Sequence, residues 1–393
     1  MNILGIEVSE LSQEEVWKKI RSFLTDGRPH YIVTPNPEII LASHQDEEFF
    51  YILNQADLAP ADGFGLKLAA LTRGKALPRI SGSDLSPKIL ELAAQKELRV
   101  AIINFKYGLS KKDDIETALK KKFPELKMII IDTDKKSELS AEELHLINQF
   151  SPNILFTSLG APYQEKIIWH SLAQIPSLNL ALGVGGSFDF ITGKIKRAPK
   201  LMRRLGLEWL FRLIKQPWRA QRIFKATFIF STKVFFWRFV HPFMYRPNVA
   251  CWLYRECSGT YEVLIVERRE EKGHWQLPQG GTDGQSLQKA GARELEEELD
   301  TKKLIVRACY RNLYKYKMPS LIQKIYGYKG QSQGLCLAEF IGEDDDIKIN
   351  FWDHQAWAWV KLDDLLERLH PVRRAGAKIF LSKFQEYLKQ NNQ

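Results

Sequence analysis

Three glutamates in the stretch from Arg293 to Glu298, written RELEEE, have the type and spacing of metal ligands. Residues three and four positions apart lie on one face of an α-helix, so Glu294, Glu297 and Glu298 could turn their carboxylates to the same side. Mg²⁺ takes oxygen ligands and keeps water and substrate phosphates in its coordination shell. A bound cation would neutralise a diphosphate and activate an attacking water, with Glu297 and Glu298 acting in catalysis. The alternative is that the stretch is the solvated face of an ordinary helix.

Several elements must surround this stretch in order to position it. The runs CWLYRE and YEVLIVERR alternate apolar and polar residues and predict a β-hairpin before the acidic helix. GLCLAEFIG and AWAWVKL predict further strands, and a terminal helix follows them. We therefore expect an α+β domain over residues 248–393, which is a comfortable size for a single domain.

The first part of the chain alternates short apolar runs with amphipathic helical patterns. The apolar runs occur in HYIVTPNPEIILASH, LRVAIINF, MIIIDT, PNILFTSLG and LNLALGVGG, and each leads into a polar or Gly-containing loop. This alternation predicts an α/β domain over residues 1–195, Rossmann-like, with a mostly parallel sheet covered by helices on both faces. Ligands of such sheets lie beyond the carboxyl ends of the strands. The informative loops are therefore TPNPE, PADGFG, SLGAPYQE and GVGGSFD.

A basic segment, residues 196–247, separates the two predicted domains. It is rich in Arg, Lys and large apolar side chains and has almost no acids, which predicts amphipathic helices followed by a linker. Aromatic rings among cations suit a membrane interface, where the rings are buried and the cations meet anionic lipid. Packing of the rings in a core is the alternative. The aromatic residues concerned are Trp209, Phe211, Trp218, Phe235, Phe236 and Trp237.

The whole chain limits the possible classes of protein. Its 393 residues suggest two or three domains, and its net charge of +10 favours anionic partners such as phosphates, nucleotides or an acidic membrane surface. The four cysteines form no CxxC pair, which argues against a zinc site or a disulfide framework and for a reducing cytoplasm. Ser12 and Glu15 predict a helical capping box near the N-terminus instead of a signal peptide. No apolar run reaches the roughly 20 residues that span a bilayer.

The first part of the chain resembles the WecG/TagA/CpsF family of bacterial glycosyltransferases over residues 1–225. The resemblance rests on the order of TPNPEII, ADGFGLKLA, RISGSDL, SLGAPYQEKIIW and GVGGSFDFITGKIKRAPKLMRRLG. It implies transfer of an N-acetylmannosamine-type sugar from a UDP donor, without a cofactor. The implied acceptor is N-acetylglucosamine on a polyprenyl diphosphate, and the product enters surface polysaccharides or teichoic-acid linkage units. Such an enzyme would act on the cytoplasmic face of the cell membrane as a peripheral protein.

Inverting glycosyl transfer needs a base that takes the proton of the acceptor hydroxyl. Asp62 is the best candidate by its position in a Gly-flanked loop, and the resemblance assigns it that role. A turn or helix-cap aspartate is the alternative. Thr34 and Asn36 would help to position the sugars, although both residue types are also favoured helix caps.

The departing diphosphate needs hydrogen-bond donors and positive charge. The resemblance implies that Gln164 and Glu165 contact the donor nucleotide or ribose; the alternative is a helix that begins after Pro162. Gly183, Gly185 and Gly186 would bring backbone N–H groups close to phosphate oxygens. The candidate leaving-group and membrane contacts, which could instead form a solvated basic face, are Arg197, Arg212, Arg219 and Arg222.

The acidic stretch, together with HWQLPQGG before it, resembles the Nudix signature, in which a Gly-rich loop leads into a helix bearing R-E-U-x-E-E. The order of the following strands is similar to the branch that cleaves dinucleoside polyphosphates and RNA 5′-terminal pyrophosphate. The resemblance implies Mg²⁺ as cofactor, a nucleoside polyphosphate as substrate, and Arg293 among the substrate-binding residues. Three departures stand out. The loop GGTDGQ is one residue shorter than GG-x-x-x-G-E, Gln285 replaces a glutamate, and Asp300 replaces the later glycine.

The leading hypothesis is therefore a bifunctional enzyme, a glycosyltransferase joined to a Nudix hydrolase. In a second hypothesis the Nudix domain carries the main activity, and the first half is a membrane and phosphate anchor. A third treats both domains as inactive and the chain as a membrane- or nucleic-acid-binding protein. Nucleic acid is the less favoured partner, because the basic segment carries aromatics at helical spacing.

Overall fold

The computed structural model describes residues 1–199, 201–202, 208–215, 217 and 220–391. The chain divides into two compact units, residues 1–236 and residues 237–393. Each unit has its own sheet and its own hydrophobic core.

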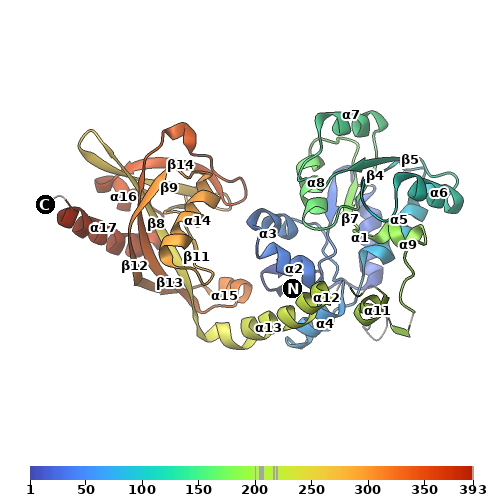
Figure 1. Ribbon diagram of the computed structural model, residues 1–393, viewed down its shortest axis with the longest axis horizontal. Helices are drawn as coiled ribbons and strands as arrows, with labels where there is room; N and C mark the ends of the chain where they lie inside the picture. Colours follow the sequence, from blue (N-terminus) through green and yellow to red (C-terminus); the bar gives the residue numbers. More distant parts are fainter. Residues whose placement is uncertain (200, 203–207, 216, 218–219, 392–393) are drawn as a thin grey trace. The chain divides into compact units, whose positions relative to one another are not determined.

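The first unit is built on a five-stranded sheet in which every pair of neighbouring strands is parallel (Figure 1). The predicted parallel sheet is therefore confirmed. Its strand order is β3-β7-β6-β4-β5, formed by His30–Ile32, Leu180–Gly183, Ile154–Thr157, Val100–Phe105 and Met128–Thr133.

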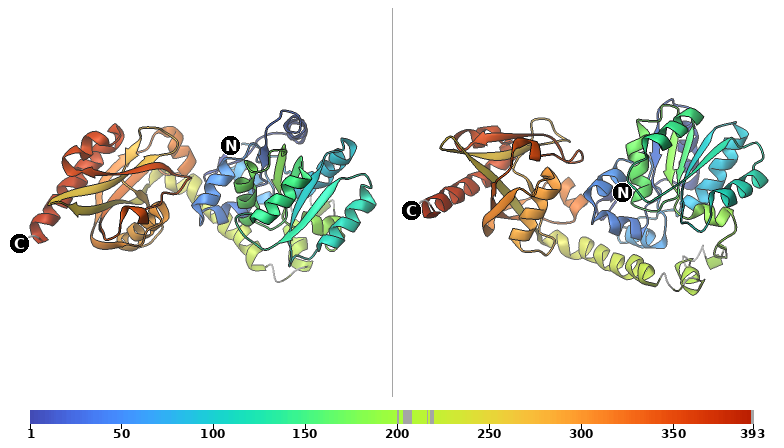
Figure 2. Two further views of the ribbon diagram at one scale, coloured as in Figure 1. Left: turned by 90° about the horizontal axis from the view of Figure 1, so that it is seen from above. Right: turned by 45° about the horizontal axis from the view of Figure 1, so that its top comes forward.

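Helices cover both faces of this sheet (Figure 2). On one face Ile102, Phe156 and Leu182 pack with residues of α1 (Gln13–Phe23), α5 (Gly82–Gln95) and α6 (Lys112–Lys122). The alternate strand residues turn to the other face, because successive side chains of a strand point to opposite sides. There they meet α8 (Tyr163–Leu172), whose Ile167 and Ile168 are fully buried. The remaining helices of this part are α2 (Pro37–Ser43), α3 (Glu47–Asn54), α4 (Phe64–Leu71), α7 (Ala141–Phe150) and α9 (Ser187–Ile191), and β1 (Asn2–Ile3) pairs with β2 (Ile6–Glu7).

The first helix begins as its sequence predicts. The Ser12 hydroxyl accepts a hydrogen bond from the Glu15 N–H at 3.2 Å, and the Glu15 carboxylate accepts one from the Ser12 N–H at 2.8 Å. This reciprocal capping box satisfies two N–H groups that the helix itself cannot pair. Val16, Ile20 and Phe23 then form the buried face of α1.

The described residues of the basic segment are helical over 208–215 and 220–243, while 196–199 are irregular and 245–247 belong to a strand. The helical part comprises α11 (Glu208–Lys215), α12 (Ala220–Phe224), the π-helical turn η2 (Lys225–Ile229), α13 (Phe230–Phe235) and η3 (Phe236–Val240), followed by η4 (His241–Phe243). Phe230 is buried, and its ring lies close to Gly65 of α4. Across the described residues, no helix is both long enough and apolar enough to pass through a membrane.

The second unit contains a mixed sheet, which confirms the predicted α+β arrangement. The path β10-β9-β8-β13-β12 is antiparallel except between β13 and β8, with β11 added to β8 and β14 to β9. The strands are β8 (Tyr245–Cys257), β9 (Thr260–Arg268), β10 (Trp275–Gln276), β11 (Gln279–Gly281), β12 (Leu304–Lys317), β13 (Gly330–Phe340) and β14 (His354–Lys361). The helices are α14 (Leu287–Leu299), α15 (Ser320–Tyr326), α16 (Leu362–Arg368), α17 (Pro371–Asn391) and the short η5 (Asp344–Asp346).

Helix α14 carries the RELEEE stretch and packs on one face of this sheet through Ala290, Leu295 and Leu299. Ser286 caps its N-terminus by accepting from the Lys289 N–H at 3.4 Å. The helix ends at Asp300, whose φ of 48° lies in the left-handed region that glycine adopts most easily. Strand β8 already begins at Tyr245, so three residues assigned to the linker from sequence, Tyr245, Arg246 and Pro247, belong to the sheet.

Candidate functional sites

In the first unit, loops from several strands meet at the carboxyl edge of the sheet. Thr34 follows β3 and is buried, and its hydroxyl oxygen lies 3.4 Å from the position that a Cβ atom on Gly82 would take. The same position is 3.6 Å from the backbone of Val184, after β7. Glycine at position 82 therefore lets the start of α5 approach both loops. Asn36 caps α2 by accepting from the Ile39 N–H at 3.0 Å, which is the capping role considered as its alternative.

Asp62 lies in this region on the loop before α4. Its backbone N–H donates to the Pro35 carbonyl at 2.8 Å, and its carboxylate is 3.7 Å from the Arg79 guanidinium. Both side chains are partly exposed, at 26% for Asp62 and 20% for Arg79. The cap of α4 is Gly63, without a side-chain hydrogen bond, so Asp62 does not cap that helix. Arg79 was not singled out from the sequence; its only signal there was its place in the stretch RISGSDL.

The side chain of Gln164 links the loops that follow β6 and β7 by hydrogen bonds. Its side-chain oxygen accepts from the Gly160 N–H at 3.2 Å and from the Gly185 N–H at 3.0 Å. A Cβ atom on Gly183 would lie 2.6 Å from the Gln164 amide nitrogen, so only glycine leaves room for this side chain. The Gly185 N–H, which the sequence suggested for phosphate contact, thus donates to Gln164.

Glu165 lies in the interior, with 1% of its surface exposed. Burial raises the pKa of Glu165 to about 7, although the hydrogen bond from Gln164 opposes this change. One carboxylate oxygen accepts from the Gln164 amide at 2.6 Å, and the other has no hydrogen-bond partner among the described residues. Burial, followed by the charge of Glu165, also raises the pKa of the Tyr31 hydroxyl. Glu165 therefore supports Gln164 from behind the loops.

The four arginines of the basic segment have different positions. Arg197 donates to the Ser83 hydroxyl at 2.9 Å and contacts the Asp84 carboxylate at 2.9 Å, near the start of α5. Burial by itself would raise the pKa of Asp84. The hydrogen bond from Ser81 and the charge of Arg197 outweigh burial, so the pKa is lower than its ordinary value. Arg222 of α12 donates to the Glu38 carboxylate of α2 at 3.1 Å. Arg212 belongs to α11, but its side chain lies outside the described part of the chain, as does the whole of Arg219.

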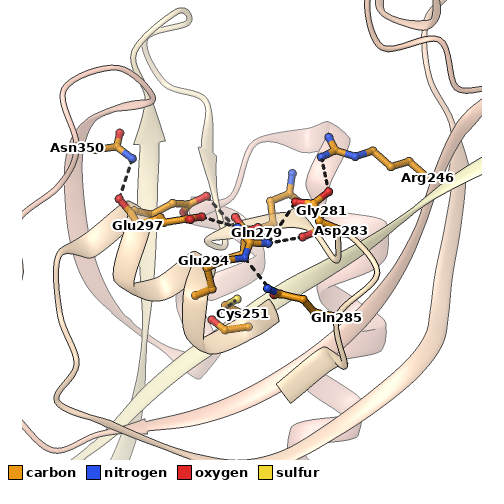
Figure 3. A network of polar contacts seen from close by, with 12 residues as sticks. Arg246, Cys251, Gln279, Gly281, Asp283, Gln285, Glu294, Glu297 and Asn350 are labelled. Atoms are coloured by element: carbon orange, nitrogen blue, oxygen red, sulfur yellow. Dashed lines mark hydrogen bonds and ion pairs between the residues drawn. The ribbon is translucent and has the colours of Figure 1, made fainter. Parts of the chain in front are cut away.

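In the second unit, Arg293 contacts several members of the polar network that Figure 3 labels, namely Gly281, Asp283, Gln285, Glu294 and Glu297. It donates to the Gly281 carbonyl at 2.6 Å and to the Gln285 side-chain oxygen at 3.2 Å. It also contacts the Glu294 carboxylate at 2.7 Å and forms an ion pair with Glu297 one turn later on α14. The guanidinium therefore joins the Gly-rich loop to the acidic helix.

Two of the three predicted metal ligands are buried, which a merely solvated helical face would not require. Glu294 is 2% exposed, and a Cβ atom on Gly280 would lie 1.7 Å from its carboxylate, so the glycine forms a close cradle. Glu298 is 5% exposed and accepts from the Gln279 N–H at 3.3 Å. Burial, together with the charge of Asp353, raises the pKa of Glu298 well above its usual range.

The oxygen-rich composition of this site fits a hard divalent cation. Carboxylate oxygens of Glu294 and Glu297 lie within 4.8 Å of each other. The second oxygen of Glu298 is buried and has no hydrogen bond among the described residues, although it lies 3.1 Å from Nε2 of His354, with which it would pair if the imidazole were protonated. Oxygen ligands of this kind are those that Mg²⁺ prefers.

The second unit also contains a pocket that no sequence motif indicated, and it shares Gln279 with the acidic site because the Gln279 N–H donates to Glu298. The side-chain oxygen of Gln279 accepts a hydrogen bond from the Gln333 amide at 2.6 Å. Arg373 reaches the pocket from α17 and donates to the Tyr316 hydroxyl at 3.3 Å. Alternating tyrosines on β12 were the available signal, since residues two apart on a strand share a face. The lining residues include Gln276, Gln279, Tyr314, Tyr316, Gln333 and Arg373.

Comparison with known proteins agrees with this division of the chain. Residues 1–242 match the glycosyl transferase WecG/TagA/CpsF family, and residues 244–381 match the NUDIX domain. The N-acetylglucosaminyldiphosphoundecaprenol N-acetyl-beta-D-mannosaminyltransferase of Bacillus subtilis (strain 168) is 34% identical over 218 residues, which cover 52% of this chain and 82% of the relative. The protein of the same name from Staphylococcus aureus (strain MRSA252) is 27% identical over 60% of this chain and 91% of its own length.

A solved structure of a C. elegans Ap4A hydrolase binary complex is similar to 37% of this chain. The match covers 98% of that structure, with 22% sequence identity and a TM-score of 0.28. The family matches account for both compact units. The chain belongs to the glycosyl transferase WecG/TagA/CpsF family and carries a NUDIX domain after its glycosyltransferase part.

Proposed function

We propose that the first unit transfers an N-acetylmannosamine-type sugar from a UDP donor to N-acetylglucosamine on a polyprenyl diphosphate, with inversion. The observation that carries this proposal is the partly exposed Asp62 carboxylate at the carboxyl edge of the sheet, 3.7 Å from the Arg79 guanidinium. Asp62 takes the proton of the acceptor hydroxyl as that oxygen attacks the sugar. The names of the curated relatives support the acceptor and the sugar.

The surrounding residues hold the two substrates. Thr34 and Asn36 position the sugars, while the Gly183–Gly186 loop, fixed by Gln164, lies against the donor. Arg197, with Arg212, Arg219 and Arg222, offsets negative charge on the departing UDP and at the membrane. We place the enzyme on the cytoplasmic face of the membrane as a peripheral protein, because its acceptor is a lipid.

UDP release in the presence of a synthetic lipid-diphosphate acceptor tests this function. Asp62→Asn should lower UDP release by about 10²–10⁴-fold, the usual contribution of a general base. Asp113→Asn, an exposed aspartate in the first turn of α6, is the matched control and should behave like the wild type. UDP release that persists unchanged in Asp62→Asn would rule out the proposed base.

We propose further that the second unit is a Mg²⁺-dependent hydrolase of nucleoside polyphosphates. Glu294, Glu297 and Glu298 would hold the cation, which when bound neutralises the diphosphate and activates water. Arg293 orders the loop and the helix around the substrate phosphates. The burial of Glu294 and Glu298 beside an oxygen-rich loop carries this proposal.

Phosphate or nucleotide release from nucleoside polyphosphates, measured with and without Mg²⁺, tests the second activity. Glu297→Gln should abolish it, and Asp62→Asn should leave it intact. If hydrolysis is present but UDP release is absent from the wild type, the Nudix unit carries the main activity and the first unit is an anchor. If both activities are absent, the binding hypothesis takes their place.

A further inference from the structure

The shortened loop before α14 forms a tight turn that presents Asp283. The Gln285 N–H donates to the Thr282 carbonyl at 2.8 Å and closes the turn. Asp283 has a φ of 45° and Gly284 a φ of 80°, so two successive residues adopt left-handed backbone. Aspartate tolerates this conformation better than most side chains. This turn places the Asp283 carboxylate near Arg293.

Asp283 and Gln285, both labelled in Figure 3, contact the same guanidinium, that of Arg293. Gln285 accepts a hydrogen bond from Arg293 Nε at 3.2 Å but brings no charge. Asp283 Oδ2 lies 3.5 Å from Arg293 Nη2, the same nitrogen that contacts Glu294 at 2.7 Å. Around Arg293 there are therefore three carboxylates, from Asp283, Glu294 and Glu297.

A second arginine restrains Asp283 from the other side. Arg246 Nη2 lies 3.7 Å from Asp283 Oδ1, and it occupies the space that a Cβ atom on Gly281 would need, 2.3 Å away. Gly281 thereby lets the Arg246 guanidinium lie against the loop backbone. The Asp283 side chain remains 63% exposed, so these ion pairs contribute little to folding stability. Any functional effect of the Asp283 charge must therefore be an electrostatic effect on Arg293 and the carboxylates around it.

We propose that Asp283 replaces the carboxylate that is absent at Gln285 and restores the negative charge of the cation site, acting through Arg293 and through space as a positioning residue. This inference rests on the hydrolase function proposed above. The amide of Gln285 keeps the hydrogen bond to Arg293, while Asp283 supplies the charge from two residues earlier in the shorter loop. The departure from the family signature is therefore compensated within the same loop.

Mn²⁺ binding to the full chain, followed by electron paramagnetic resonance, tests the proposal without relying on turnover. Asp283→Asn should weaken Mn²⁺ binding roughly tenfold, the effect of one nearby charge in a partly solvated site, while the melting temperature stays unchanged. Adding Gln285→Glu to Asp283→Asn should restore the affinity. Glu296→Gln is the matched control, because Glu296 lies on the same helix and pairs with Lys302.

The outcomes separate this inference from the hydrolase proposal. Wild-type affinity in Asp283→Asn, or no recovery in the double variant, overturns the role of Asp283. Glu297→Gln should lose Mn²⁺ binding in the same titration. If the wild type and Glu297→Gln are indistinguishable, the cation site itself is absent, and the proposed hydrolase function is overturned with it.

Discussion

The side chain of Gln164 fills the space that a Cβ atom on Gly183 would need, with its amide nitrogen 2.6 Å from that position. The same side chain holds the Gly160 and Gly185 N–H groups, so one residue fixes the loops after two neighbouring strands. The donor site proposed above depends on this arrangement, since both loops lie at the carboxyl edge of the sheet.

Gly183→Ala should therefore displace Gln164 and lower UDP release at least tenfold. The added methyl group cannot coexist with the amide at its present position, and the loops lose two hydrogen bonds of about 1 kcal/mol each. Steady-state UDP release at several donor concentrations measures the effect, which should appear mainly in KM for the donor. Gly193→Ala is unsuitable as a control, because its φ of 78° would strain the backbone for another reason. Ala173→Gly on the C-cap of α8 provides a change of the same size away from the loops. An unchanged KM in Gly183→Ala would contradict the proposed use of this loop.

Glu165 makes folding stability depend on pH. Its pKa is about 7 in the folded chain against an ordinary value of 4.5, so the folded protein retains a proton that the unfolded chain releases. Wild-type stability should therefore fall as the pH rises from about 4.5 to about 7 and then level off, by about 3 kcal/mol in total. Glu165→Gln removes this dependence and keeps an oxygen that accepts from Gln164.

Differential scanning calorimetry of the full chain at pH 5 and pH 8 measures this difference. The variant should melt at a higher temperature than the wild type at pH 8, and the two should be close at pH 5. An equal difference at both pH values would mean that Glu165 does not titrate between them.

The sequence predicted the elements of the first unit well because its signals are local. Apolar runs marked the parallel strands, and Ser12 with Glu15 marked the start of α1. The contacts that shape the site are not local: Arg79 reaches Asp62, and Gln164 reaches Gly185, only after loops from different strands have been brought together by packing. Asn36 was ambiguous for a related reason, since its type suits both a helix cap and a polar site, and only the fold shows its hydrogen bond to Ile39.

The second unit followed the same rule. The helical spacing of RELEEE was readable, but the burial of Glu294 and Glu298 depends on Gly280 and on strands far away in sequence. Arg246 had no local signal in the sequence. It is the second residue of β8, and only the fold brings it close to Asp283. The pocket that includes Gln279 combines residues from β10, β12, β13 and α17, so no single segment could reveal it.

Gly280→Ala should abolish nucleoside polyphosphate hydrolysis while leaving UDP release unchanged. A Cβ atom at this position would lie 1.7 Å from Glu294, so the carboxylate must leave its cradle. Both activities are measured on the same preparation of the full chain, and UDP release then serves as the internal control for folding. Hydrolysis at the wild-type rate would show that Glu294 does not need its present position.

Arg79→Gln should lower UDP release by about tenfold or more, because its guanidinium is the cation nearest to the Asp62 carboxylate among the ion pairs of the described residues. A positive group at 3.7 Å keeps a carboxylate ionised and available as a base. Arg28→Gln is the matched control, since that side chain is 71% exposed and pairs with Asp26 away from the site. UDP release at the wild-type rate in Arg79→Gln would contradict this role of the guanidinium.

Phe224 and Phe228 should contribute to membrane attachment of the first unit. Their rings stack with centroids 5.2 Å apart, yet they are 54% and 62% exposed, and Lys225 lies between them in the chain. Exposed aromatic pairs beside cations bind the interface of an anionic bilayer through both burial and charge. The double substitution of Phe224 and Phe228 by Ser should therefore reduce sedimentation with phosphatidylglycerol vesicles severalfold, while UDP release with a short-chain, water-soluble acceptor is preserved. Leu146→Ser on α7 is the control. Leu146 is also exposed, at 41%, but its helix contains no Lys or Arg. Equal vesicle binding by the double variant and the wild type would exclude this surface as the attachment site.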